Sequence, residues 1–183
     1  GRLKELLIPG VTVLIKQEKG EHRKTKYSTQ AVYKDNTLIS LNTLLPNRFT
    51  EFLINNQRID FLAKWIIYKK EFINGKSRFD FMLENKNQFM YLEVKSVSLV
   101  ENNIAYFPDA ITERGAKHVN HLGDLAASGV DSMVLFVIQR HDSILFSPKW
   151  DRDPKFSYAL HNAWKNGLKV KAIHSKIKKH EVH

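Results

Sequence analysis

A continuous apolar run, MVLFVI (133–138), constrains the fold of this chain more than any other stretch. Turn-forming residues bound it, and its length suits a strand rather than a helix. Because polar and apolar residues do not alternate in it, we expect a strand that is buried on both faces. Helical patterns flank it: one over 112–129 starts at a candidate N-cap, Thr112, and another over 154–166 follows Asp153 as its N-cap. The run therefore predicts a sheet that helices cover.

Shorter runs predict the other strands of this sheet. Residues 78–83 and 89–94 are strand-like and flank a polar loop, which indicates a hairpin, and a further strand precedes them. Residues 168–175 predict one more strand. From residue 66 the predicted order is β-β-β-α-β-α-β, preceded by a helix that starts within 47–57. The predicted fold class is therefore mixed α/β (α+β), with a mixed sheet flanked by helices.

The first third of the chain predicts a small β subdomain. Residues 8–17, 29–34 and 37–42 are predicted as short strands with charged turns between them. Three such strands cannot close a barrel alone, and the chain does not begin with Met, so we expect a preceding piece to be missing. The predicted division is a partial β subdomain at 1–45, an α/β domain at 46–177 and a charged tail at 178–183.

The net charge of the chain indicates which classes of partner it can bind. Lys and Arg number 29 against 19 Asp and Glu, a net charge of +10, and a basic protein of this size is attracted to polyanions, chiefly nucleic acid. The chain has no Cys, which excludes a disulfide scaffold, thiolate metal sites and cysteine nucleophiles. No stretch approaches the roughly 18 apolar residues of a membrane span. We expect a cytoplasmic protein that binds no membrane; its oligomeric state stays open, with a homodimer as one option.

Several exposed-looking residues of the β subdomain have two interpretations. A basic cluster that includes Arg23 and Lys24 is either a solvated surface or a phosphate-binding one. The aromatic residues Tyr27 and Tyr33 either belong to the small core or stack on bases. In the larger domain, Trp164 has apolar neighbours and is predicted to pack rather than to stack.

The predicted hairpin carries three charged residues inside apolar strands. Because side chains alternate along a strand, Glu93 and Lys95 share one face, and Asp80 lies on the face opposite Phe79 and Phe81. The two carboxylates can converge at one end of the sheet, where they would suit Mg²⁺ or Mn²⁺. The lysine could then orient a water or stabilise charge on a phosphate.

A third carboxylate, that of Glu71 on the preceding strand, is a candidate ligand of the same metal. The set Asp80-x12-Glu93-Val94-Lys95 follows the PD-(D/E)xK nuclease pattern. An ordinary ion pair between neighbouring strands remains the alternative.

Longer runs of sequence show a resemblance to a known family. RFDFML, YLEVKSVSL, YFPDAITERGAKHVNHL and VLFVIQRHDSILFSP together resemble the sugar fermentation stimulation protein family, SfsA, and LIPG and LNTLLPNR fit the same family. The resemblance implies an amino-terminal OB-like β domain joined to a PD-(D/E)xK nuclease-like domain. It also implies nonspecific DNA binding and a role in regulating sugar utilisation genes, such as those for maltose. The nuclease-like site falls on Asp80, Glu93 and Lys95, with Glu71 as a fourth member.

Further candidates surround this site. In TERGAKH, Arg114, Lys117 and His118 are placed to hold a phosphate, unless the two cations only pair with Glu113 on the helix surface. His121, on a neighbouring face of the same helix, is predicted to be a surface residue. The remaining candidates are Gln139 and Arg140 at the end of the buried strand, Asp109 as a helix cap, and Asn42, Thr43 and Arg48 along a groove of the β domain.

Three functions fit these observations. The chain is a Mg²⁺-dependent nuclease, a DNA-binding regulator that does not cut, or a structural protein whose charged pairs only tie strands together. The intact Asp…Glu-x-Lys set favours the first, and the family resemblance favours DNA binding. We therefore predict DNA binding with a nuclease-type metal site and leave catalysis open, because fold alone does not fix activity.

Overall fold

The protein is described by a computed structural model at residue 3 and over residues 6–18, 25–34 and 36–178. A small antiparallel sheet holds β1 (Val13–Gln17), β2 (Tyr27–Lys34) and β3 (Thr37–Ser40). The main sheet has five strands in the order β11-β9-β6-β5-β4, and a third sheet has the order β10-β8-β7. Their bounds are β4 (Ile66–Asn74), β5 (Ser77–Asn85), β6 (Gln88–Val97), β7 (Leu99–Glu101), β8 (Ile104–Phe107), β9 (Asp131–Ile138), β10 (Leu145–Pro148) and β11 (Lys169–His174).

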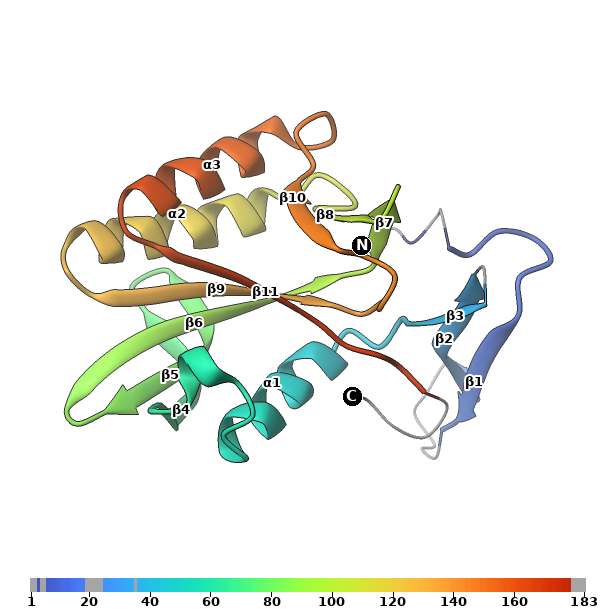
Figure 1. Ribbon diagram of the computed structural model, residues 1–183, viewed down its shortest axis with the longest axis horizontal. Helices are drawn as coiled ribbons and strands as arrows, with labels where there is room; N and C mark the ends of the chain where they lie inside the picture. The colour runs from blue at the N-terminus through green and yellow to red at the C-terminus, as the bar shows by residue number, and fades with distance from the viewer. Residues whose placement is uncertain (1–2, 4–5, 19–24, 35, 179–183) are drawn as a thin grey trace.

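Helices cover both faces of the main sheet (Figure 1). On one face lie α2 (Glu113–Ala127) and α3 (Pro154–Lys165), and on the other lie α1 (Leu45–Asn55) and a short 3₁₀ helix (Asp60–Leu62). Mixed pairing holds the sheet together, since β9 is parallel to β6 and β11 while β4, β5 and β6 are antiparallel. The predicted mixed α/β fold, with a mixed sheet flanked by helices, is confirmed.

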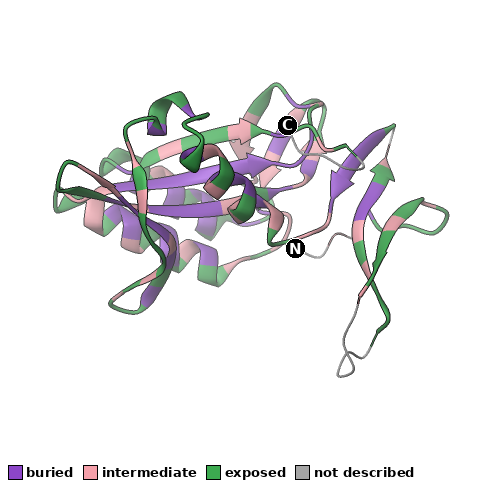
Figure 2. Ribbon diagram, turned by 90° about the horizontal axis from the view of Figure 1, so that it is seen from below, coloured by how far each residue is buried: buried purple, intermediate pink, exposed green. Residues whose placement is uncertain are grey.

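Strand β9 is the centre of the core, as its apolar run predicts. Every residue from Ser132 to Ile138 is buried. Figure 2 shows that the buried residues gather in the strands at the centre of the main sheet. Its side chains alternate between two hydrophobic clusters: Phe136 packs with α2 and α3, while Leu135 packs with α1. Burial of these side chains on both faces stabilises the sheet by the hydrophobic effect.

The predicted caps Thr112 of α2 and Asp153 of α3 are present, and Asp153 joins the two helices. Asp109, predicted as a helix cap, does not take this position, because Thr112 is the N-cap of α2. Thr112 Oγ1 accepts a hydrogen bond from the Gly115 amide at 3.1 Å, and Asp153 Oδ1 accepts one from the Phe156 amide at 3.0 Å. The second oxygen of Asp153 accepts the Thr112 amide at 2.8 Å. Asp153 therefore fixes the start of α2 as well as that of α3.

The predicted alternation fails at Asp80, where β5 bends. Phe79 and Phe81, expected on one face, pack into the opposite cores. Pairing with β4 joins residues 79 and 81 to 72 and 70 but skips Asp80 and Glu71, and the pairing with β6 begins only at Phe81. Instead, the Asp80 carboxylate accepts the amide of Val94 at 2.7 Å. A side chain has taken the place of a backbone partner, and the strand changes face there.

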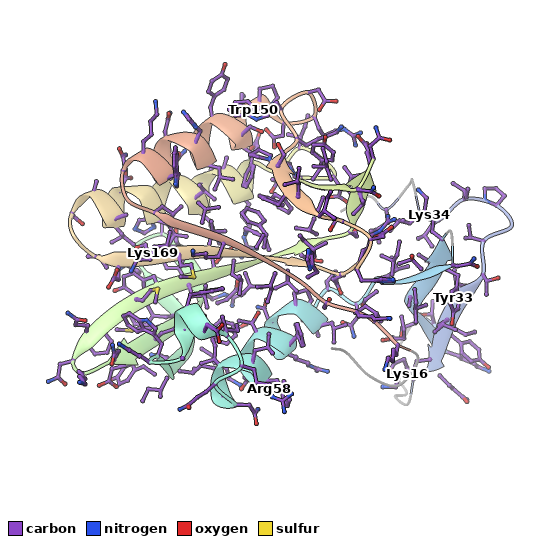
Figure 3. The ribbon with its side chains drawn as sticks, viewed as in Figure 1. Lys16, Tyr33, Lys34, Arg58, Trp150 and Lys169 are labelled. Atoms are coloured by element: carbon purple, nitrogen blue, oxygen red, sulfur yellow. The ribbon has the colours of Figure 1, made fainter. Side chains whose placement is uncertain are left out.

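Three short strands and one side chain differ from the sequence predictions. Strands β7, β8 and β10 have only three or four residues, too few for a periodic pattern to show. Trp164, predicted to pack, is 58% exposed on α3, because the buried stripe of that helix runs through Phe156, Leu160 and Ala163. Trp150 lies at the outer edge of the molecule beside the same helix (Figure 3).

The small sheet carries exposed aromatic residues. Tyr27 and Tyr33 are both exposed, and Tyr33 lies with Lys16 on this sheet (Figure 3). The core beneath them is formed by Leu6, Val32 and Ile39. The two tyrosines are thus not core residues, which leaves the stacking interpretation open. In the described part of the chain, no helix is both long and apolar enough to cross a membrane.

Candidate metal and nucleic-acid site

The centre of the candidate site is the Glu93 carboxylate, in the middle of β6. The residue is only 4% exposed. Its Oε1 atom accepts a hydrogen bond from Lys95 Nζ at 2.6 Å and lies 2.8 Å from Nδ1 of His118, a buried residue of α2. Its Oε2 atom is buried and has no hydrogen-bond partner among the described residues. A buried carboxylate oxygen without a partner is costly, so this atom is available to a ligand.

The bend in β5 brings the Asp80 carboxylate to the same place. Its Oδ2 atom accepts the amide of Val94, the residue between Glu93 and Lys95, and its Oδ1 atom accepts Asn47 Nδ2 at 2.7 Å. Asn47 belongs to α1, which covers the face of the main sheet opposite α2. The predicted convergence of Asp80, Glu93 and Lys95 is therefore what the structure shows. Because the Glu93–Lys95 pair is buried, it is not an ordinary solvated ion pair.

The two carboxylates differ in their affinity for a proton. Burial, followed by the nearby charge of Glu93, raises the pKa of Asp80 above its ordinary value. Burial opposes ionisation of Glu93 as well, but hydrogen bonds from His118 and Lys95 lower its pKa below the ordinary value. Glu93 is thus the more readily ionised of the two, and the charge on Asp80 is less favourable unless a cation compensates it.

We expect Asp80→Asn to raise the free energy of unfolding of the metal-free protein near neutral pH. The raised pKa of Asp80 means that its ionised form destabilises the folded state, and asparagine removes that charge. A rotated Asn47 amide can still bond the new side chain. The Asp80 charge destabilises the parent protein fully above the pKa of Asp80 in the folded state and not at all below its pKa in the unfolded state. The free energies of unfolding of the parent and the variant should therefore converge in acid. Urea unfolding in a chelator, over the acid to neutral range, measures the difference.

The matched control for this prediction is Asp124→Asn, at an exposed position of α2. It should change the unfolding free energy little at any of these pH values. If the parent and the Asp80→Asn variant unfold at the same urea concentration near neutral pH, the charge of Asp80 does not oppose folding.

These residues fit a divalent cation. The described residues contain no group of three or more His, Cys, Asp or Glu side chains placed to hold a metal. Mg²⁺, however, is often bound through only one or two carboxylates and keeps several waters. Asp80 and the unpartnered Oε2 of Glu93 supply two such carboxylates. They are the residues that would hold the cation.

A cationic groove lies beside this cluster, between α2 and the turn that joins β4 to β5. Its volume is about 800 Å³. Arg114, Lys117 and His118 line it, as the sequence predicts. The structure adds Lys76, Arg78 and His121. We call this surface, lined by Lys76, Arg78, Arg114, Lys117, His118 and His121, the cationic groove.

His121 differs from its prediction as a plain surface residue. Its Nδ1 atom lies 2.7 Å from Ser77 Oγ, and its ring packs against Phe79 at 5.3 Å between centroids. The sequence signal was its place near His118 on one helix face. Asn47 had no such signal, because it reaches Asp80 from 33 positions away. Lys76 and Arg78 lie close to Asp80 in the chain, but nothing in their local sequence indicated that they face α2.

Other predicted site residues lie elsewhere. Glu71 is 71% exposed on its side chain and pairs with Arg78 at 3.7 Å, so it does not join Asp80 and Glu93. Its backbone has a positive φ of 50° at the skipped position of β4, which takes it out of the regular strand alternation.

Arg140 is buried rather than open to a phosphate. Both ends of its guanidinium bond the carboxylate of Asp142, at 2.9 and 2.5 Å. This bond, more than any other cause, lowers the pKa of Asp142. Arg48 is exposed on α1, while Arg23 and Lys24 lie outside the described residues.

Comparison with known proteins agrees with this fold. Residues 44–181 match the family model described as "Sugar fermentation stimulation protein RE domain", and residues 1–41 match "SfsA N-terminal OB domain". The chain belongs to the sugar fermentation stimulation protein family. The family resemblance and the OB-like first domain predicted from the sequence are thus confirmed.

Individual SfsA relatives cover nearly all of the chain. It is 42% identical over 173 residues to a sugar fermentation stimulation protein homolog of Clostridium kluyveri, covering 94% of this chain and 75% of the relative. It is 43% identical over 171 residues to the homolog of Clostridium botulinum (strain Alaska E43 / Type E3), covering 93% of this chain and 74% of that relative. Pyrococcus furiosus SfsA, solved in complex with Ca²⁺, superposes with a TM-score of 0.93 at 28% identity and covers 100% of this chain and 79% of that one.

Proposed function

We propose that this SfsA-family chain binds nucleic acid and hydrolyses its phosphodiester bonds with Mg²⁺ or Mn²⁺. The observation that carries the proposal is the buried, unpartnered Oε2 atom of Glu93, next to Asp80 and Lys95. The arrangement follows the PD-(D/E)xK nuclease pattern. The Pyrococcus furiosus relative is a complex with Ca²⁺, a hard cation that, like Mg²⁺, takes oxygen ligands.

Each residue of the cluster has a distinct role in this proposal. A cation bound by Asp80 and Glu93 would supply charge for the phosphate and a water of lowered pKa. His118 and Lys95 both contact Oε1 of Glu93, so Oε2 is the oxygen that would bind a cation. Asn47 and the Val94 amide fix Asp80 from two sides. The positive charge of Lys95 would stabilise the negative charge that develops on a phosphate bound beside the two carboxylates during hydrolysis.

The cationic groove is proposed to hold the nucleic-acid backbone. It brings cations from two separate elements to the side of His118, which itself contacts Glu93. Backbone contacts of this kind carry no sequence information, so binding would be nonspecific. DNA as the substrate, and a chain without Cys, both agree with a cytoplasmic location.

Removing two cations of the groove should weaken DNA binding and its dependence on salt. Each phosphate that the protein no longer neutralises reduces the slope of log K against log salt by ~0.7 for a single strand. The double variant Arg114→Ala/Lys117→Ala should therefore reduce the slope by ~1.4. Fluorescence anisotropy of a labelled oligonucleotide at several salt concentrations, in a chelator, measures it.

The control for the groove variant is Lys155→Ala/Lys165→Ala, which removes the same charge from exposed positions of α3. It should leave the slope nearly unchanged. Equal slopes for the two double variants would mean that net charge, and not the groove, attracts DNA.

A second candidate is a DNA-binding regulator of sugar utilisation genes, such as those for maltose, that does not cut DNA. The observation that favours it is the small number of ligands: only two carboxylates meet, and the described residues hold no three-ligand group. Both candidates bind DNA through the groove. They differ in one result, which is whether DNA is cleaved when Mg²⁺ or Mn²⁺ is added.

A further inference from the structure

A second cavity, of about 310 Å³, lies where the β domain meets the main sheet. Its walls come from Ser40 and Thr43 near β3, from Ser96 and Ser98 at the end of β6, and from the loop before α2. This volume is near the lower end of the ~300–1,000 Å³ typical of small-molecule sites. It suits one small ring system and is too small for a duplex.

Gln139, which lines this cavity, has a hydrogen-bond acceptor that no described residue uses. The residue is 2% exposed and lines the cavity at the end of β9. Its Nε2 atom donates to Ser96 Oγ at 2.6 Å, while its Oε1 atom is buried with no partner among the described residues. Leaving a buried amide oxygen without a donor is unfavourable, so the cavity suits a ligand that donates a hydrogen bond there.

The remaining lining completes a site for a flat, polar ring. Phe107 and Ile111 offer apolar contact, Asp109 is a second acceptor, and hydroxyl groups surround them. Among its described lining residues there is no Lys or Arg, in contrast to the cationic groove. A phosphate is thus disfavoured here, whereas a nucleobase offers ring faces for contact and N–H groups for the acceptors.

The cavity is next to the proposed catalytic cluster. Ser96, which lines it, directly follows Lys95 in β6, with its side chain on the opposite face of the strand. At the start of α2, Thr112 lines the cavity and Glu113 lines the cationic groove, so the two openings adjoin. A single strand with its phosphates along the groove can therefore place one base in the cavity. A paired base cannot enter without leaving its stack.

We propose that this cavity binds one unpaired nucleobase of the substrate, with Gln139 Oε1 accepting a hydrogen bond from the base. The inference rests on the proposed function and sharpens it, because it makes single-stranded or locally unpaired nucleic acid the substrate class. Duplex DNA without an unpaired nucleotide is then a poorer ligand than a single strand.

A cycle of two changes tests the cavity. One oligonucleotide is an ordinary single strand, and the other has the same backbone with abasic residues throughout. For the parent chain in a chelator, we expect loss of the bases to weaken binding about tenfold, since one stacked and bonded base contributes on that order. In the Ala110→Phe variant the new ring fills the cavity, so removal of the bases should weaken binding less than about twofold.

Two further variants separate the alternatives. Gln139→Leu, which keeps the cavity open, should also reduce the effect of base removal and serves if Ala110→Phe fails to fold. Arg114→Ala/Lys117→Ala should weaken both oligonucleotides and leave their ratio unchanged. If base removal costs all four proteins the same, the cavity proposal is overturned and DNA binding stands. If the parent binds neither oligonucleotide, the proposed function itself is wrong, and the cavity proposal with it.

Discussion

Lys95→Met is expected to reduce metal-dependent cleavage of DNA by ~10²–10⁴-fold, the range for a group that assists proton transfer or stabilises developing charge. The side chain is largely buried, and its Nζ atom lies 2.6 Å from Glu93 Oε1, so its charge is fixed beside the carboxylates. Methionine keeps most of the length and apolar contact of the lysine stem. The loss should therefore appear in kcat, while the fold and DNA binding are retained.

Metal binding separates the role of Lys95 from that of the carboxylates. Glu93→Gln should abolish binding of Mg²⁺ or Mn²⁺ in calorimetry, because Oε2 loses its charge. Lys95→Met should retain it, since removal of a neighbouring cation makes the carboxylate a better ligand. If the Lys95→Met variant binds metal as weakly as the Glu93→Gln variant, the lysine maintains the structure of the site and has no separate role in catalysis.

The control for the cleavage measurement is Lys70→Met, which removes an exposed lysine paired with Glu51 at 2.9 Å. It should cleave DNA as the parent does. All the proteins are purified in parallel by the same procedure, so that a contaminating nuclease would appear in every preparation. A parent that binds DNA and metal but cleaves no single-stranded, duplex or branched DNA, and no RNA, would favour the regulator.

The parts of the site that could be predicted depend on neighbours in sequence. Glu93 and Lys95 are two residues apart on one strand, so period-two alternation predicted that they share a face. The short hairpin was sufficient to predict that Asp80 lies near them. Strand β9 was predictable from its own composition. Thr112 and Asp153 were predictable as caps because a cap is a local feature.

The parts that could not be predicted depend on contacts between distant residues. Asn47 reaches Asp80 across 33 positions, and His121 reaches Ser77 across 44. The bend at Asp80 also has no local signal: the Asp80 side chain accepts the Val94 amide from the neighbouring strand, and Phe79 and Phe81 lie on opposite faces. Alternation applied through Asp80 therefore gave the wrong face for one phenylalanine.

Phe79→Ala is expected to lower the free energy of unfolding by about 3–5 kcal/mol, as for other fully buried phenylalanines. The ring is completely buried and contacts Tyr91, His118 and His121 at centroid distances of 5.7, 6.0 and 5.3 Å. Domains are typically stable by only about 5–15 kcal/mol, so the loss is a large share of the total. For a chain of this length it corresponds to a fall in Tm of roughly 6–20 °C.

Phe52→Ala is the matched control, because the same atoms are removed from a half-exposed position on α1. Its cost should stay below about 1 kcal/mol, since little apolar surface there is shielded from water. Urea unfolding of both variants measures the difference. Similar midpoints for the two would show that the core closes around the missing Phe79 ring. A large difference is expected, because this ring holds the strand against α2 on the face where His118 meets Glu93.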